Sequence, residues 1–431
     1  MYMTNSNQHI IPRDQHSVSR ELISENALKV LYRLHKAGYQ AFLVGGGVRD
    51  ILLGLRPKDF DIATNATPEE IKKLFRNCRI IGRRFRLAHI LYGRDIIEVA
   101  TFRAHCDDNI EQRGDGMIVR DNVYGTVEED AIRRDFTVNA LYYNIADFSI
   151  HDYCGGLADL EKRQLKMIGD PVERYKEDPV RMLRAVRLGC KLNLSIEENT
   201  AKPINEMAHL LEGVPAARLW EEYKKMFLAG RAQRTFNQLK SFELLPYLFP
   251  QTAQAIDNND DFAEFVALAL ENTDRRINDD KSINPAFLLA VMLWKPLMDR
   301  TDKLVSKGMH FNDAFYKSFN PTINAQSQTI SIMKRYGVVM QDIWALQLRL
   351  KFNFGKRVWS ILEHPRFRAG YDFLLLRSEV DPSLKPLADW WTEFQEASRE
   401  QRIKMLSKNK PSGKKRRPRK RSNHKPSRAS N

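Results

Sequence analysis

The sequence predicts an α+β protein in which a small mixed-sheet head is followed by an elongated, all-α neck and body. Three observations predict this class. Short strand-like runs, broken by glycine, alternate with helical segments between residues 40 and 103. From residue 178 onward, apolar residues recur at helical spacing and no convincing strand run appears. Residues 408–431 hold 11 Lys and Arg and no acid, which predicts a disordered basic tail.

Length and charge indicate how the chain is organised. At about 100–200 residues per domain, 431 residues suggest two or three domains. The formal net charge is +15, and outside the basic tail it is only +4. A polyanion is the favoured partner of the tail, and a solubilising tail without a fixed partner is the alternative. We expect an N-terminal arm at 1–23, a head at 24–160, a neck at 161–250, a body at 251–407 and the tail at 408–431.

Cysteine usage and hydropathy indicate the compartment. None of the four cysteines forms a CxxC spacing, so the sequence suggests neither a zinc site nor a disulfide framework. The longest apolar run, Ala286–Trp294, is too short to span a bilayer and predicts a buried helix. The first residues lack the apolar core of a signal peptide. We therefore expect a cytoplasmic monomer without a transmembrane segment; association of the basic tail with a membrane surface stays open.

Local signals predict the elements of the head one by one. Ser24 is a helix N-cap, Thr67 and Glu70 form a capping box, and Gly93 is a hairpin turn. Residues 104–123 are polar and read as a mobile loop. In chain order we expect a helix at 24–39, a strand at 40–46, a short helix at 47–54, a strand at 58–64, a helix from 67, a hairpin at 86–103, and a segment at 126–145 that begins as a helix and ends as a strand.

Two carboxylates one residue apart are the strongest chemical signal. Asp59 and Asp61 lie in a predicted strand, so their side chains point to the same face. Such a pair repels unless a cation lies between the two groups, and Mg²⁺ prefers one or two carboxylates together with substrate phosphates. The three glycines at 45–47 precede the pair and let backbone N–H groups approach a phosphate. Arg49 follows them, in a position to clamp the same phosphates.

Five ordered motifs extend this pattern into a family resemblance. The stretch from Leu43 to Thr64 resembles the signature of the DNA polymerase β-type nucleotidyltransferases, and more narrowly that of class II RNA nucleotidyltransferases: bacterial poly(A) polymerases and tRNA CCA-adding enzymes. Further matches cover about residues 40–190. They are IIEVATFR (96–103), EEDAIRRDFTVNALYYN (128–144), DYCGGLADL (152–160) and YKEDPVRMLRAVRL (175–188). The resemblance implies a nucleotidyltransferase head followed by a helical neck and body.

Within that family, the chain resembles the poly(A) polymerases more than the CCA-adding enzymes. The stretch at 77–90, the N-terminal arm, the helical C-terminal half and the basic tail are similar to theirs. A polymerase that acts on many RNA 3′ ends gains from non-specific phosphate contacts, whereas one compact tRNA does not require them. The resemblance implies template-independent addition of AMP from ATP to RNA 3′ ends. A CCA-adding enzyme is the alternative, and a non-catalytic RNA-binding protein is disfavoured by the intact Asp59 and Asp61 pair.

The resemblance also implies residue roles and partners. Asp59 and Asp61 would bind two Mg²⁺ ions, and Asp135 is favoured over Glu98 as a third catalytic carboxylate. Asp178 and Arg181, at i and i+3 on one helix, would read the base edge. RNA 3′ ends are the expected partners, RNA-decay factors or an RNA chaperone are hypotheses, and a role in RNA turnover follows. The expected ATP-binding residues are Gly45, Gly46, Arg49, Arg134 (with Arg133), Asn139, Asp178, Arg181 and Arg184.

Overall fold

The computed structural model describes residues 9–82, 86–104 and 123–408. The basic tail at 409–431 and most of the predicted loop at 104–123 lie outside the described residues. The chain divides into two compact units, which are described separately below. The first comprises residues 1–250 with 326–331, and the second comprises 251–325 with 332–431.

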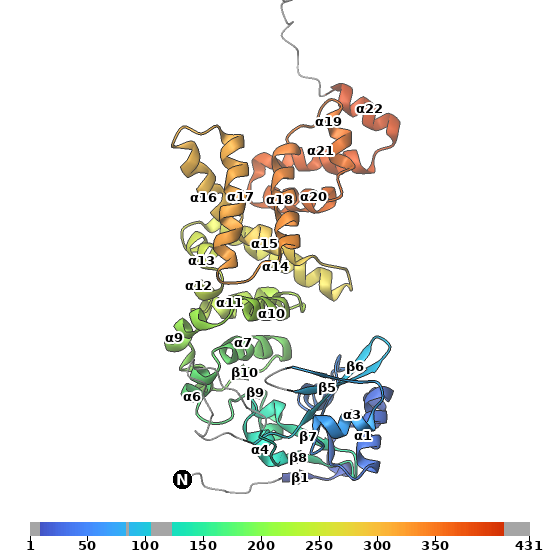
Figure 1. Ribbon diagram of the computed structural model, residues 1–431. Coiled ribbons are helices and arrows are strands. Elements are labelled where there is room, and N and C mark those ends of the chain that lie inside the picture. Colours follow the sequence, from blue (N-terminus) through green and yellow to red (C-terminus); the bar gives the residue numbers. More distant parts are fainter. Residues whose placement is uncertain (1–8, 83–85, 105–122, 409–431) are drawn as a thin grey trace, which may run out of the picture. The chain divides into compact units, whose positions relative to one another are not determined.

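The first unit contains an eight-stranded mixed sheet (Figure 1, blue to teal). Its strand order is β1-β8-β7-β2-β3-β6-β5-β4, in which β3 and β6 are parallel and the other neighbours are antiparallel. The predicted mixed sheet is therefore confirmed. The strands are β1 (His9–Ile11), β2 (Ala41–Val44), β3 (Asp61–Thr64), β4 (Cys78–Ile81), β5 (Leu87–Tyr92), β6 (Asp95–Thr101), β7 (Leu141–Asn144) and β8 (Ile150–Asp152).

The predicted helix starts and turns of the head are present. The Ser24 hydroxyl accepts from the backbone N–H of Ala27, and Thr67 and Glu70 form a reciprocal capping box. Gly93, with φ of 63°, turns the hairpin between β5 and β6. The head helices are α1 (Glu25–Lys36), α2 (Gly46–Leu52), α3 (Pro68–Leu74), α4 (Val127–Ile132) and α5 (Gly156–Glu161), with 3-10 turns at Arg13–Gln15, Arg20–Leu22 and Thr137–Asn139.

Two local expectations were wrong. The N-terminal segment is not an arm from His9 onward, because β1 pairs with β8 at the edge of the sheet and Ile11, Val18 and Ile23 are buried. A short amphipathic segment that only completes a sheet edge carries no local signal of that pairing. In addition, only Asp61 belongs to β3, whereas Asp59 lies in the connection two residues before that strand.

Aromatic packing holds the sheet to the segment that carries α4. The rings of Phe42 and Tyr142 meet edge-on at 5.9 Å, and Phe42 also contacts Phe102 at 6.0 Å. Ala131 on α4 packs into the same buried cluster. Since Asp59, Asp61 and residues 130–135 flank this cluster in the sequence, its packing positions them.

The remainder of the first unit is predominantly helical, with one departure from the prediction. A short parallel pair joins β9 (Gln164–Leu165) to β10 (Ser195–Ile196), so a strand does occur after residue 180. Two residues are too few to give a period-2 pattern. The helices are α6 (Pro171–Glu177), α7 (Val180–Leu192), α8 (Glu198–Ala201), α9 (Ile204–Met207), α10 (Ala216–Phe227), α11 (Ala232–Ser241) and α12 (Leu245–Leu248), with a 3-10 turn at Ala208–Gly213.

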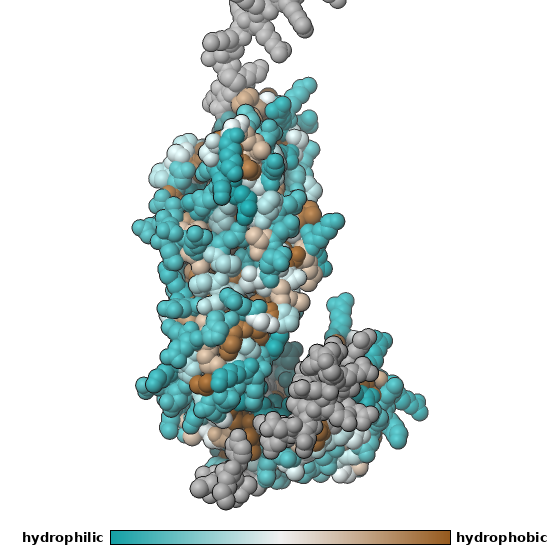
Figure 2. All heavy atoms as spheres, turned by 60° about the vertical axis from the view of Figure 1, so that its left-hand side comes forward, coloured by the Kyte–Doolittle hydropathy of each residue, from teal (hydrophilic) through white to brown (hydrophobic). Residues whose placement is uncertain are grey.

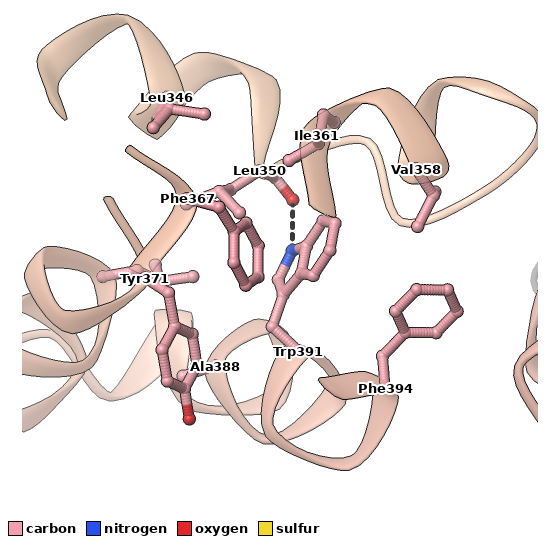
Figure 3. Close-up of a cluster of buried hydrophobic side chains, with 10 residues drawn as sticks. Leu346, Leu350, Val358, Ile361, Phe367, Tyr371, Ala388, Trp391 and Phe394 are labelled. Carbon is pink, nitrogen blue, oxygen red and sulfur yellow. Dashed lines mark hydrogen bonds between the residues drawn. The ribbon is translucent and has the colours of Figure 1, made fainter. Parts of the chain in front are cut away.

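The described part of the second unit is all-α, as the sequence predicts. One of its cores surrounds Trp391, whose indole N–H donates to the carbonyl of Leu350 at 2.8 Å (Figure 3). Phe367, Tyr371 and Phe394 pack around that ring. The helices are α13 (Pro250–Asp257), α14 (Asp260–Asn278), α15 (Pro285–Met292), α16 (Trp294–Val305), α17 (Phe311–Ser327), α18 (Lys334–Arg349), α19 (Arg357–Leu362), α20 (Phe367–Val380), α21 (Lys385–Glu396) and α22 (Arg399–Lys408), with a 3-10 turn at Pro382–Leu384.

Apolar residues are distributed as in a packed core rather than a membrane segment. The run at 286–294, which predicted a buried helix, forms α15 and continues to Trp294, and its residues from Leu288 to Leu293 are all buried. Among the described residues, no helix is long and apolar enough to cross a bilayer. On the face drawn in Figure 2, hydrophilic side chains cover most of the described surface and hydrophobic ones are scattered.

Candidate active site

A glycine turn at the end of β2 forms one side of the candidate site. Gly45 has φ of 71°, a conformation that favours glycine, and its N–H donates to the carbonyl of Leu141 at 3.3 Å. A Cβ at this position would lie 3.5 Å from Nη1 of Arg134. Gly46 and Gly47 lie within α2. Of the three glycines, Gly45 is therefore the one whose backbone conformation favours glycine.

Three carboxylates gather where β3 begins. Asp61 is the first residue of β3 and is directly opposite Glu98 on the parallel strand β6, so both side chains share one face of the sheet. Burial raises the pKa of Asp61 to about 6, and the negative charges of Glu98 and Asp59 act in the same direction. Part of Asp61 is still exposed to solvent. A bound cation would relieve the repulsion among these carboxylates.

The donor set fits a hard divalent cation. Among the described residues, no group of three or more His, Cys, Asp or Glu side chains could hold a metal ion by itself. Asp59 and Asp61 supply carboxylate oxygens only, which suits Mg²⁺ better than zinc. Mg²⁺ commonly uses one or two carboxylates and completes its coordination with water and substrate phosphates. An incomplete protein site of oxygen donors is thus compatible with Mg²⁺.

Arg134 is an arginine whose charge acts on Asp61. Its Nε donates to the hydroxyl of Tyr142 at 2.7 Å, and its Nη2 donates to Asp130 at 2.9 Å. The charge of Arg134 opposes the rise in the pKa of Asp61. Nη1 approaches Gly45, so the guanidinium is close to the glycine turn and its charge also acts on Asp61. This position suits a phosphate that approaches both.

Asp130 and Tyr142 position Arg134, and the sequence reasoning missed both. Asp130 is buried and accepts bonds from Arg133, Arg134 and the Tyr142 hydroxyl. Burial alone would raise the pKa of Asp130, but the two arginines outweigh it and hold the pKa below its usual value. The i, i+3 and i, i+4 spacing of Asp130 to the arginines was the available signal.

Asp135 lies in a separate network, with Arg184 of α7. Nε of Arg184 donates to Oδ2 of Asp135 at 2.8 Å, while Oδ1 accepts from Asn139 at 3.0 Å and from the N–H of Phe136 at 2.8 Å. Burial opposes ionisation, but Arg184 and these hydrogen bonds outweigh it and lower the pKa of Asp135. The structure therefore brings Glu98 beside Asp61, and it holds Asp135 against the neck helix α7.

Arg49 belongs to the same network. It is buried, and its guanidinium donates to Asp50 and to Oδ1 of Asn139. Asn139 in turn donates to Asp135. In this arrangement Arg49 connects α2 to α7 through Asn139 and Asp135, and its charge is already balanced by Asp50. The prediction that it directly clamps a phosphate is not matched by its contacts.

Asp178 and Arg181 do not lie on one helix as the sequence predicted, because Asp178 is the cap residue after α6 and Arg181 lies in the first turn of α7. Oδ2 of Asp178 accepts from Arg218 of α10 at 2.6 Å, and Oδ1 accepts from the N–H of Val180. Arg181 donates to Glu177 and to the carbonyl of Arg174, both at 2.7 Å. Their side chains bond instead to α6, to α10 and to the first residue of α7.

A pocket of about 550 Å³ opens beside the last turn of α7. Apolar side chains of Leu53, Leu55 and Leu192 form part of its lining. Four cations line it with no carboxylate among the lining residues: Arg163, Lys191, Arg231 and Arg234. Burial and the charges of Arg49, Arg187 and Lys58 lower the pKa of Lys191. The electrostatics of this end of α7 suit phosphate groups.

Comparison with known protein families supports the motif-based resemblance. Residues 41–166 match the family described as "Poly A polymerase head domain". Residues 193–256 match "Probable RNA and SrmB- binding site of polymerase A", and residues 307–425 match "Polymerase A arginine-rich C-terminus". The three matches occur in order along the chain.

Individual relatives narrow the assignment. The chain is 51% identical to poly(A) polymerase I of Salmonella typhimurium over 92% of this chain and 88% of that protein. It is 44% identical to poly(A) polymerase I of Haemophilus influenzae over 96% and 95% of the two chains. The crystal structure of the Bacillus stearothermophilus CCA-adding enzyme with CTP has a TM-score of 0.54, covering 90% of this chain and 88% of that one. At 22% identity, this last similarity supports the fold alone. The chain belongs to the poly(A) polymerase I family of nucleotidyltransferases.

Proposed function

We propose that the protein adds AMP from ATP to RNA 3′ ends without a template and releases pyrophosphate. Membership of a family of polynucleotide adenylyltransferases supports the reaction class. The observation that carries the proposal is the placement of Asp61 and Glu98 on one face of the sheet, with Arg134 close to the Gly45 turn and its charge acting on Asp61. Carboxylates and a cation at one site match the needs of phosphoryl transfer, in which positioning and electrostatics supply most of the catalysis.

The reaction balances without a redox partner. The 3′ oxygen of RNA forms a bond to the α-phosphorus of ATP and loses its proton, and the bond from that phosphorus to the bridging oxygen breaks as pyrophosphate departs. Arg134 would hold a phosphate beside the Gly45 turn. Asp59 and Asp61 would hold Mg²⁺, for which we propose two ions, and bound Mg²⁺ supplies charge neutralisation and Lewis acidity at the transferring phosphate.

For the third carboxylate, the contacts favour Glu98 over Asp135. Glu98 lies opposite Asp61, and its Oε1 is 3.2 Å from Nε2 of His89. Both oxygens of Asp135 already accept hydrogen bonds from Arg184, Asn139 and the N–H of Phe136. We assign Glu98 to the reacting centre, and we assign Asp135 as a positioning residue that aligns α7 with the head.

The contacts of the remaining predicted nucleotide-binding residues suggest a different role for each group. Asn139 and Arg184 would orient the ribose and phosphates from within the Asp135 network. Asp178 and Arg181 remain our candidates for the base edge, and this role requires Asp178 to exchange its bond with Arg218. Arg49 would act indirectly, through Asn139.

We assign the cation-lined pocket to upstream RNA. Asn193, Arg231 and Arg234 fall inside the residues matched by the RNA-binding family description. The backbone of RNA is polyanionic, and Leu53 and Leu55 offer an apolar surface for a base or ribose. We further propose that the added tails promote RNA turnover, since an unstructured 3′ extension gives a degrading enzyme a single-stranded start.

A primer-extension assay tests the proposal. An unstructured RNA 3′ end and Mg²⁺ are supplied with each single nucleoside triphosphate in turn. We expect long tails from ATP alone and loss of extension in Asp59→Ala and Asp61→Ala. Asp95→Ala is the matched control, because it removes an acid of the same sheet at the β5 and β6 turn, where Asp95 accepts from Asn26.

Three outcomes separate the alternatives. If Asp59→Ala and Asp61→Ala still add tails from ATP, the assignment of these two residues to the active site is refuted. Addition of C and then A to tRNA only would assign the chain to the CCA-adding activity. Binding of RNA without incorporation of any nucleotide would leave a non-catalytic RNA-binding protein. Glu98→Gln should abolish extension, whereas Asp135→Asn should mainly destabilise the contact with α7.

A further inference from the structure

Two phenylalanines are exposed in the second unit, in a loop for which the proposed reaction has no role. Phe352 and Phe354 lie between α18 and α19, with relative exposures of 39% and 36%. Elsewhere in this unit, rings such as those of Phe373 and Phe394 are fully buried. Exposing a phenylalanine forgoes the stabilisation that burial of its ring would provide. A binding partner that covers the pair is one physical reason to keep it at the surface.

The two rings present separate faces. Their centroids lie 6.3 Å apart and their planes are inclined by 73°, so the rings meet edge-on and are not stacked on each other. The guanidinium of Arg357 lies 5.6 Å from the centre of the Phe352 ring. Two flat groups with different orientations can accept two bases that are splayed apart, but they cannot accept a paired stack.

The charge around the rings has one sign. Arg349, Lys351, Lys356 and Arg357 flank the two phenylalanines. No Asp or Glu occurs in the sequence between Asp342 and Glu363. Lys351, Lys356 and Arg357 are exposed. The loop is therefore a cationic surface that carries exposed aromatic faces.

We propose that this loop is a second RNA-binding site, at which Phe352 and Phe354 stack on bases of a single strand and the flanking cations hold its phosphates. Aromatic stacking with a basic groove is the physical basis of sequence-tolerant binding to single strands. Duplex RNA keeps its bases inside the helix and offers no face to stack on. The protein's own tail carries 11 Lys and Arg without an acid, so the loop repels it.

The site would hold RNA independently of the reacting 3′ end. It lies in the second unit, whereas the carboxylates and the pocket lie in the first. The inference rests on RNA being the substrate, as proposed above. Its consequence is that RNA long enough to reach both sites binds more tightly than a short primer.

Direct binding measurements test the site separately from catalysis. The full chain is titrated into a 3′-labelled single-stranded oligoribonucleotide in the absence of ATP, and fluorescence anisotropy gives the Kd. Replacing both rings, Phe352→Leu with Phe354→Leu, keeps the surface apolar but removes its aromatic faces. We expect the Kd to rise at least about 10-fold. Phe352→Tyr with Phe354→Tyr should restore most of the affinity.

The matched control is Tyr316→Leu, because Tyr316 is an exposed aromatic residue on α17, in the same unit, with relative exposure of 48%. It should leave the Kd unchanged. A duplex of the same length should bind equally to the parent and to the leucine variant. If the leucine variant is poorly folded, Lys351→Gln with Lys356→Gln provides a second test and should reduce the salt dependence of binding.

Several results would overturn the proposal. The proposal is overturned if the leucine variant binds single-stranded RNA as tightly as the parent, or if the tyrosine variant loses as much affinity as the leucine variant. A change in oligomeric state by light scattering, with an unchanged Kd for RNA, would assign the rings to contacts between copies. If the parent chain binds single-stranded RNA with a Kd that depends on the two rings but adds no nucleotide, the proposed reaction is refuted and this site stands.

Discussion

Replacing Asp135 with asparagine tests whether this carboxylate stabilises the packing of α7 against the head. The substitution keeps the shape of the side chain but removes the charge that pairs with Arg184. The Asp135 side chain is 12% exposed and that of Arg184 is 32% exposed, so water replaces the lost partner only in part. The prediction is that α7 opens more readily while the fold of the head is kept.

The magnitude follows from the contacts. A hydrogen bond to a charged group contributes about 1.5–3 kcal/mol. The bonds from Arg184 share one oxygen of Asp135 and are therefore counted once. Allowing for the partial exposure of Arg184, we expect Asp135→Asn to lower the free energy of opening of α7 by about 2–3 kcal/mol. Since each 1.4 kcal/mol is tenfold, amide exchange in α7 should accelerate about 30- to 160-fold.

Hydrogen exchange, followed by mass spectrometry of peptides from α7, measures the free energy of opening of this helix. The method does not require the whole chain to unfold in one step. Asp178→Asn is the matched control, because it also neutralises a carboxylate paired with an arginine. That pair is more exposed, at 23% for Asp178 and 50% for Arg218, and should contribute about 1 kcal/mol or less. Equal acceleration in the two variants would refute the reasoning.

The pH dependence has a defined sign. Arg184 and the hydrogen bonds hold the pKa of Asp135 below its ordinary value, despite burial. Its contribution is therefore complete above the unfolded pKa of about 3.9 and is lost as pH falls through the lower folded pKa. The ratio of exchange rates between parent and Asp135→Asn should be constant from pH 6 to 8 and decline only in acid.

Three further predictions address the reacting centre and the second core. Asp61→Asn should lower kcat at least about 100-fold in primer extension, while the Kd for RNA stays within about twofold; parallel loss of both would point to misfolding. Gly45→Ala and Gly54→Ala both place alanine at φ near 70°, and urea titration should show that each costs about 1–3 kcal/mol, with the larger loss at Gly45, whose ψ of −130° lies outside the left-handed helical region. Only Gly45→Ala should lower kcat/KM for ATP, because no atom lies within 4 Å of a Cβ at Gly54. Trp391→Phe should reduce the stability of the second unit by about 1–3 kcal/mol in calorimetry, since the Leu350 carbonyl loses its donor; an unchanged transition would refute that role.

The sequence by itself determined the fold class and the family. Helical periodicity, the Thr67 capping box and the Gly93 turn depend on residues close together in the chain, so local patterns predict them. The five ordered motifs identified a nucleotidyltransferase because the chemistry requires particular residue types at short spacings. The edge strand β1 escaped prediction because its partner β8 lies about 140 residues away in the chain.

Only the tertiary structure decided which charged residues act together. Spacing placed Asp178 and Arg181 on one helix face, where both would read the base edge, and left Arg49 free to meet a phosphate. Packing instead gave Arg218 to Asp178 and buried Arg49 against Asn139. Pairing of β3 with β6 placed Glu98 beside Asp61, although 37 positions separate them in the chain. A charged side chain bonds to whichever partner the fold brings within reach, and long-range strand pairing and helix packing determine that partner.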